Sequence, residues 1–200
     1  MRRSMAPLAS LAWRSKRERG AFSTPSRMTA KTSIENGMPI ARTILAEFNH
    51  EMANTRKVLE RIPEEQAAWR PHPKSYSLGD LAMHVSNIPT WVAIALMQDQ
   101  WDANPPDGQK GAKRAFDTRN ALLKQFDHNV AEAVSVIADT SDEEMRKPWT
   151  LKNRGAVVFS LPRTAVLRSF VMNHLIHHRG ELTVYLRLKN VRLPAIYGGT

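Results

Sequence analysis

The stretch that decides the fold is LRSFVMNHLIHHRGEL, residues 167–182. Its inward-facing positions recur at steps of three and four, the repeat of an α-helix with one face on a core: Leu167, Val171, His174, His178, Glu181 or Leu182, and Tyr185. Two successive positions on this face are histidine. Residues four apart on a helix have Cβ atoms about 5–6 Å apart. The two imidazoles are therefore spaced to share a metal ion.

Three further segments show the same helical repeat. Helices are predicted over about residues 40–62, 77–97, 112–137 and 160–188. Ser77 is a good N-cap for the second helix, with Asp80 at the third position of a capping box. Pro89 should kink that helix one turn after His84, because proline removes a backbone hydrogen bond.

The segments between these helices are longer than tight hairpins need. Residues 64–76 and 101–111 contain prolines that forbid regular helix, and residues 139–158 are interpreted as an irregular crossover. No stretch alternates convincingly as a strand does. The expected fold is therefore all-α, a four-helix bundle with long inter-helix connections, and such connections often border a site.

Composition favours one soluble domain. The chain has 200 residues, a formal charge of +10 and no cysteine, which excludes disulfides, cysteine nucleophiles and cysteine-ligated metals. Residues 1–36 hold eight basic and two acidic residues, against 21 and 17 in the other 164. Most of the excess charge thus lies in a short segment, so nucleic acid becomes a minor alternative rather than the default partner.

Residues 1–36 are predicted to be a disordered basic extension, with residues 37–200 as the folded domain. Three interpretations of the extension stay open: an organelle transit peptide, an arm that contacts nucleic acid, and a plain extension upstream of Met28 or Met38. No signal peptide fits, and the longest clean apolar run, residues 91–97, is far shorter than the about 20 residues of a membrane span. We expect a soluble cytoplasmic protein without membrane contact, organellar import remaining open.

A third histidine, His84, is expected to face inward on the second helix, three residues after Leu81. A lone inward histidine is most often a core residue bonded to a carbonyl or hydroxyl. Three of them leave several nitrogens to satisfy, and one divalent metal would satisfy all three. The residue after His174 is leucine rather than the glutamate of a metalloprotease helix, which argues against peptide hydrolysis by that route.

Four longer stretches of the sequence resemble the DinB family of DinB/YfiT-like metalloenzymes. They are TRKVLERIP (55–63), WRPHPKSYSLGDLAMH (69–84), LRSFVMNHLIHHRGEL (167–182) and YLRLKNVRLPAIYG (185–198). The resemblance implies a four-helix bundle, usually a homodimer, with a divalent metal, commonly zinc or nickel. Carried onto this sequence, the metal ligands are His84, His174 and His178, and Arg179 and Glu181 lie close behind them.

The resemblance also implies a function. Relatives include transferases that activate low-molecular-weight thiols, so we expect a thiol transferase or hydrolase acting on a small electrophile. The alternative is a non-catalytic, dimeric metal-binding stress protein whose basic arm contacts nucleic acid.

Several side-chain roles stay open at this point. Glu181 and Asp80 are candidates for supporting a ligand or acting as a base, or else for helix capping and surface pairing. Arg179 either binds an anionic group of the substrate or pairs with Glu51 of the first helix.

Overall fold

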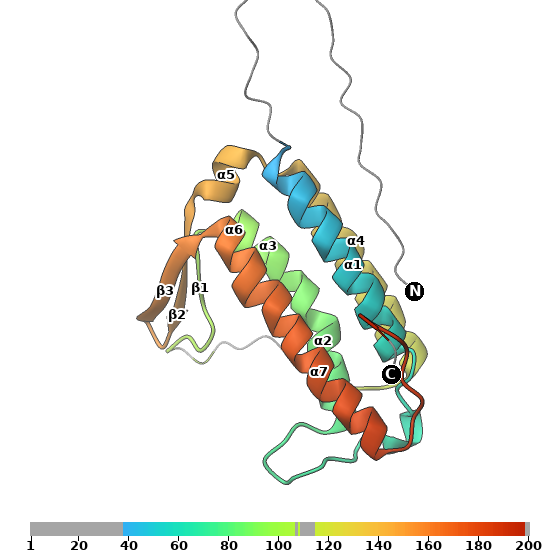
Figure 1. Cartoon of the computed structure of the whole chain (residues 1–200). Helices are drawn as coiled ribbons and strands as arrows, with labels where there is room; N and C mark the ends of the chain where they lie inside the picture. Colours follow the sequence, from blue (N-terminus) through green and yellow to red (C-terminus); the bar gives the residue numbers. More distant parts are fainter. Residues whose placement is uncertain (1–37, 107, 109–114, 199–200) are drawn as a thin grey trace, which may run out of the picture. The chain divides into compact units, whose positions relative to one another are not determined.

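The computed structural model describes residues 38–106, 108 and 115–198 (Figure 1). The predicted basic extension, residues 1–36, lies outside the described residues. Helices dominate the described part. Their bounds are α1 Ile40–Leu59, η1 Glu64–Gln66, α2 Leu78–Asn87, η2 Ile88–Thr90, α3 Trp91–Met97, α4 Arg119–Asp139, α5 Asp142–Arg146, α6 Arg163–Val166, η3 Leu167–Met172 and α7 Asn173–Leu188.

The first two predicted helices form for the expected reasons. Phe48, Met52 and Leu59 of α1 are buried, and their separations of four and seven residues put them on one helix face. The side chain of Ser77 accepts a hydrogen bond from the backbone N–H of Asp80 at 3.1 Å and so caps α2. Pro89 lies in the 3₁₀ turn η2 between α2 and α3, where the kink was predicted.

The other two helices begin later than predicted. α4 begins at Arg119, where the side chain of Thr118 caps it, and the start near residue 112 lies outside the described residues. The last helical segment begins at Arg163 because the residues before it belong to a strand. Its η3 part is π-helical, with wider turns than an α-helix.

The all-α prediction is wrong in one respect, because the chain also contains a three-stranded sheet. Its strands are β1 Gln100–Asp102, β2 Pro148–Asn153 and β3 Ala156–Pro162, in the order β1-β2-β3. β1 pairs parallel to β2, and β2 pairs antiparallel to β3. The predicted irregular crossover, residues 139–158, therefore holds α5, β2 and the start of β3.

A two-residue turn connects β2 and β3. Arg154 and Gly155 have φ angles of 52° and 79°, the pair of positive values that a type I′ turn requires. Asp102 of β1 accepts hydrogen bonds from the backbone N–H groups of both turn residues, at 3.1 and 2.7 Å. These bonds tie β1 to the hairpin.

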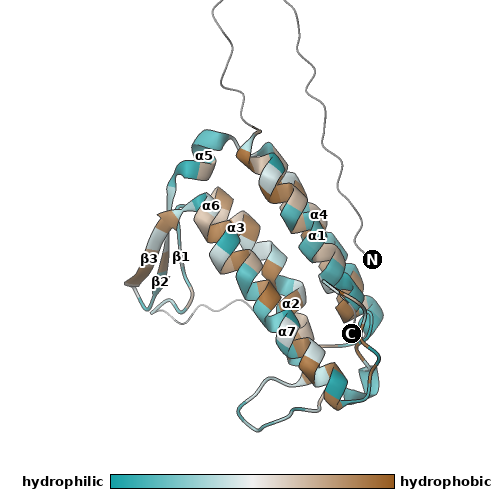
Figure 2. Ribbon diagram, in the orientation of Figure 1, coloured by the Kyte–Doolittle hydropathy of each residue, from teal (hydrophilic) through white to brown (hydrophobic). Residues whose placement is uncertain are grey.

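The core lies between the helices, and the sheet covers one end of it. α1 lies against α4, and α2 lies against both α4 and α7 (Figure 1). Each long helix carries apolar and polar bands (Figure 2), as expected for helices with one face on a core. The sheet is anchored by Trp149, which is fully buried and donates its indole N–H to the carbonyl of Ile94 in α3. No helix among the described residues is both long and apolar enough to cross a lipid bilayer.

Candidate metal centre

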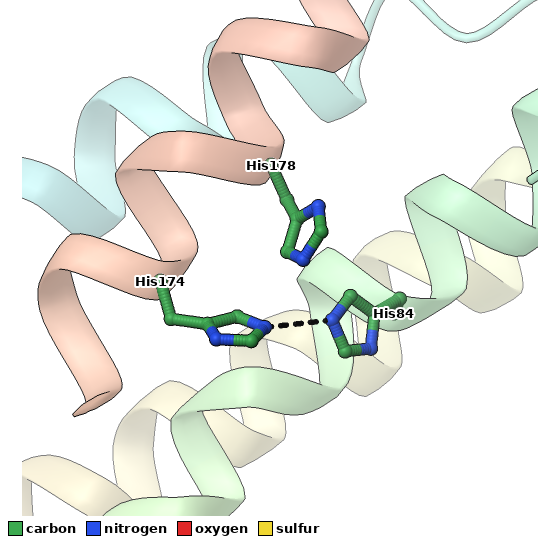
Figure 3. Close-up of side chains that lie close together, drawn as sticks. All are labelled: His84, His174 and His178. Carbon is green, nitrogen blue, oxygen red and sulfur yellow. Dashed lines mark hydrogen bonds between the residues drawn. The ribbon is translucent and has the colours of Figure 1, made fainter. Parts of the chain in front are cut away.

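The three histidines predicted as ligands come together on two neighbouring helices. His84 projects from α2, and His174 and His178 project from α7 one turn apart (Figure 3). Each offers a ring nitrogen, and these nitrogens all lie within 4.8 Å of one another. The adjacency of α2 and α7, which one sequence cannot reveal, is thus present in the structure.

The spacing of the nitrogens suits a divalent cation. The Nε2 atoms of His84 and His174 are 3.1 Å apart. Two histidine nitrogens on one tetrahedral zinc ion lie about 3.3 Å apart, given zinc–nitrogen bonds of about 2.0–2.1 Å. Burial, and to a smaller degree the neighbouring His178 and His177, lowers the pKa of His174 to about 4. The side chain is therefore neutral at pH 7, which is the form that binds a metal.

The histidines border the core rather than belong to it, which corrects the predicted helix face. The buried residues of α7 are Leu175, Arg179, Leu182 and Leu186. His174 and His178 each come one position earlier in the chain and are partly exposed. The π-helical turn before α7 accounts for this shift, because a π turn takes up about one residue more than an α turn.

Glu181 lies directly behind His178. Its Oε2 atom is 2.6 Å from Nδ1 of His178, and its Oε1 atom is 3.3 Å from Nε2 of His177. His178 is 14% exposed, whereas His177 is 67% exposed, so the carboxylate connects the cluster to a surface histidine. With Nδ1 bonded to a carboxylate, His178 presents Nε2 to the other two rings.

Arg179 is paired with Glu51, which was one of the two alternatives for it. Its Nη2 atom lies 2.7 Å from Oε2 of Glu51, and both side chains are buried. Nη1 donates to the carbonyl of Glu51 and to the hydroxyl of Thr55. Tyr197, near the end of the chain, accepts from Arg179 and donates its hydroxyl to Glu51 at 2.6 Å. The guanidinium therefore connects α7 to α1 and to the C-terminal segment.

Asp80 and three other histidines have partners outside the cluster. Asp80 accepts from Ser77 at 2.7 Å, as its capping alternative predicted. His50 contacts Asn54, and His128 pairs with Glu132 on the exposed face of α4. The backbone N–H of Lys74 donates to the exposed His72.

Aromatic side chains surround the three histidines, and no sequence motif singles them out. Tyr76 stacks on His84, with ring centroids 5.7 Å apart. Trp91 contacts His84 and His174 at 5.8 and 4.9 Å, and Phe170 stacks on Trp91 at 5.0 Å. Their signal in the sequence was slight: each lies within eight residues of a ligand candidate, in or beside a predicted helix.

Comparisons with known proteins agree with this fold. The model of the DinB family matches residues 28–200. The uncharacterized protein YrdA of Bacillus subtilis is 24% identical over 157 residues, which cover 77% of this chain and 86% of YrdA.

Two solved structures are similar over most of the chain. A DinB-like protein from Bacillus cereus has a TM-score of 0.58 and 19% identity, and the match covers 78% of this chain and 97% of that one. The DinB-like protein YjoA of Bacillus subtilis has a TM-score of 0.58 and 21% identity, covering 77% and 97%. Because the family model matches the whole described region, the chain belongs to the DinB family.

Proposed function

We propose that this protein is a metal-dependent enzyme that activates a low-molecular-weight thiol, or water, against a small electrophile. The observation that carries the proposal is the three-histidine cluster on α2 and α7, with its nitrogens within 4.8 Å of one another. His84, His174 and His178 would hold the metal, zinc or nickel. When bound by three neutral imidazoles, such a cation keeps its full charge and lowers the pKa of a thiol or water.

The location of the cluster supports chemistry over a purely structural metal. All three side chains are partly exposed at the border of the core. A structural zinc site is usually closed by four protein ligands, whereas a catalytic site has three and remains accessible. Since the chain has no cysteine, any thiol must arrive as a substrate.

Glu181 supports the site by orienting His178. Its carboxylate accepts a hydrogen bond from Nδ1, which keeps the proton on that nitrogen and leaves Nε2 available as the ligand atom. The pairing also makes the imidazole a stronger electron donor. Glu181 is thus a positioning residue for His178.

Metal analysis of the purified full chain tests the proposal. We expect about one divalent ion per chain, and we expect His178→Ala to lose tight binding while keeping its helical circular dichroism. The matched control is His128→Ala, which removes a histidine 69% exposed on α4 and should leave metal content unchanged. Tight binding by the His178→Ala protein would contradict the proposed ligand set. A loaded protein that turns over no thiol and electrophile pair would favour the non-catalytic alternative.

A further inference from the structure

An aromatic rim lies beside the histidine cluster, formed by Tyr76, Trp91, Trp101 and Phe170. These residues come from three separate parts of the chain: the loop before α2, the α3 and β1 region, and the η3 turn. Trp101 contacts Trp91 and Phe170 at centroid distances of 6.0 and 6.3 Å. Tyr76 lies on the other side, 5.7 Å from the ring of His84 and 6.4 Å from that of His178.

The rim is neither core nor open surface. Tyr76 is 40% exposed, and the other three rings are partly buried. Phe170 also packs against the sheet, 5.8 Å from Trp149 and 5.9 Å from Phe159. The aromatic rings thus reach the solvent boundary next to the ligand nitrogens.

Nearby charged side chains are engaged elsewhere. Arg179, the candidate for binding an anionic substrate group, is 2% exposed and paired with Glu51. Glu181 is held by His178 and His177. The anion-binding alternative therefore has no exposed candidate in Arg179, whereas the aromatic rings lie beside the histidines and reach the surface.

We infer that the aromatic rim binds a planar apolar group of the thiol substrate, so that this thiol carries an aromatic or similar apolar moiety near its sulfur atom. This inference rests on the proposed metal-dependent function. Aromatic rings attract a planar apolar partner in offset or edge-to-face geometry at centroid distances of about 4.5–7 Å. The pairs within the rim already have such spacings.

Three thiols that share a two-carbon chain test the inference on the cobalt-loaded full-length protein: 2-phenylethanethiol, 2-mercaptoethanol and 2-mercaptoethanesulfonate. The chain has no cysteine, so a thiolate-to-cobalt absorption band reports only the added thiol. We expect 2-phenylethanethiol to bind at least about tenfold more tightly than the other two, the factor that a favourable aromatic contact provides.

Variants of the rim residues show which side chains cause the preference for 2-phenylethanethiol. Trp101→Ala removes a ring that contacts Trp91 and Phe170, and it should reduce the tenfold preference to about twofold or less. Tyr76→Ala is the second variant, should Trp101→Ala disturb the sheet. Tyr76→Phe is its matched control, because it keeps the ring and should keep the preference. In each variant the preference is expressed relative to 2-mercaptoethanol measured on the same protein, so that a general change at the metal site cancels.

The outcomes separate the inference from the function on which it rests. Equal binding of the three thiols to a loaded protein, or tightest binding of the sulfonate, overturns the rim inference and leaves the metal site standing. A loaded protein that binds none of the thiols overturns both the inference and the thiol chemistry. A chain that takes up no cobalt, zinc or nickel overturns the proposed function itself.

Discussion

Replacing Arg179 by methionine removes the cation from a buried ion pair, and we expect a loss of about 3–4 kcal/mol in the free energy of unfolding. The side chains of Arg179 and Glu51 are only 2% and 7% exposed, so the remaining carboxylate cannot be hydrated. Tyr197 still donates one hydrogen bond to it, which places the cost in the lower part of the range for broken buried pairs. Methionine nearly preserves the packed volume, so the loss in the free energy of unfolding reports the unpaired charge of Glu51 rather than a cavity.

A double-mutant cycle isolates the pair. Glu51→Leu alone leaves a buried guanidinium and should cost a similar amount. The double variant combines Glu51→Leu with Arg179→Met in one chain and contains no unpaired charge at this pair. Its free energy of unfolding should lie within about 1 kcal/mol of that of the natural protein. The coupling energy obtained this way should be about 5 kcal/mol or more and should barely depend on salt, because the pair is shielded from solvent.

Urea unfolding followed by circular dichroism measures these differences. A chelator belongs in every sample, because a bound metal would add its own stabilisation. A loss below about 1 kcal/mol for Arg179→Met, or costs that simply add in the double variant, would refute the structural role. A variant of normal stability that fails only with anionic substrates would instead restore the alternative in which Arg179 binds the substrate.

Three further results are expected. Glu181→Gln should weaken metal affinity about tenfold in a competition titration, whereas Glu132→Gln, which alters a similar exposed histidine pair, should not. Because the pKa of His174 is lowered to about 4, the unfolded chain binds a proton that the folded chain does not between pH 6.5 and 4. Urea midpoints of the metal-free protein should therefore fall as pH drops through that window, and less so in His174→Gln. Gly180→Ala should raise the thermal midpoint, since an added Cβ meets nothing within 4 Å, whereas Gly79→Ala should lower it, since its Cβ would lie 2.9 Å from a phenylalanine side chain.

The position of the histidine cluster was predictable from the sequence to within one helical position. Histidines four apart on one helix must lie near each other whatever the tertiary structure, so His174 and His178 could be paired from spacing alone. Their contact with His84 depends on which helices are neighbours, which a single helical repeat does not contain. The pairing of Arg179 with Glu51 could be stated only as one of two alternatives, because the sequence does not show which helix lies opposite Arg179.

The sheet was not predictable because its strands lack the usual signal. Every residue of β3 except Phe159 is exposed, so its two faces do not alternate in hydrophobicity. β2 does alternate, with Trp149 and Leu151 buried, but it is six residues long and begins with a proline. What makes these segments strands is their pairing with each other and the type I′ turn at Arg154, a position where a sequence pattern favours asparagine or glycine.

The shift of α7 by one residue links structure to function. Its surface carries two parallel rows, one with His174, His178 and Glu181 and the other with Leu175 and Arg179, each residue of the second row one position after a histidine. If the histidines occupied the buried row, as their spacing predicted, a metal there would be closed off from substrate. Because the ion pair of Arg179 fixes the second row against α1, the rotation of the helix is set, and the histidines are held at the partly exposed border of the core, as the proposed function requires. The buried pair with Glu51 thus gives the arginine that follows His178 a structural role in the fold, which the double-mutant cycle above tests.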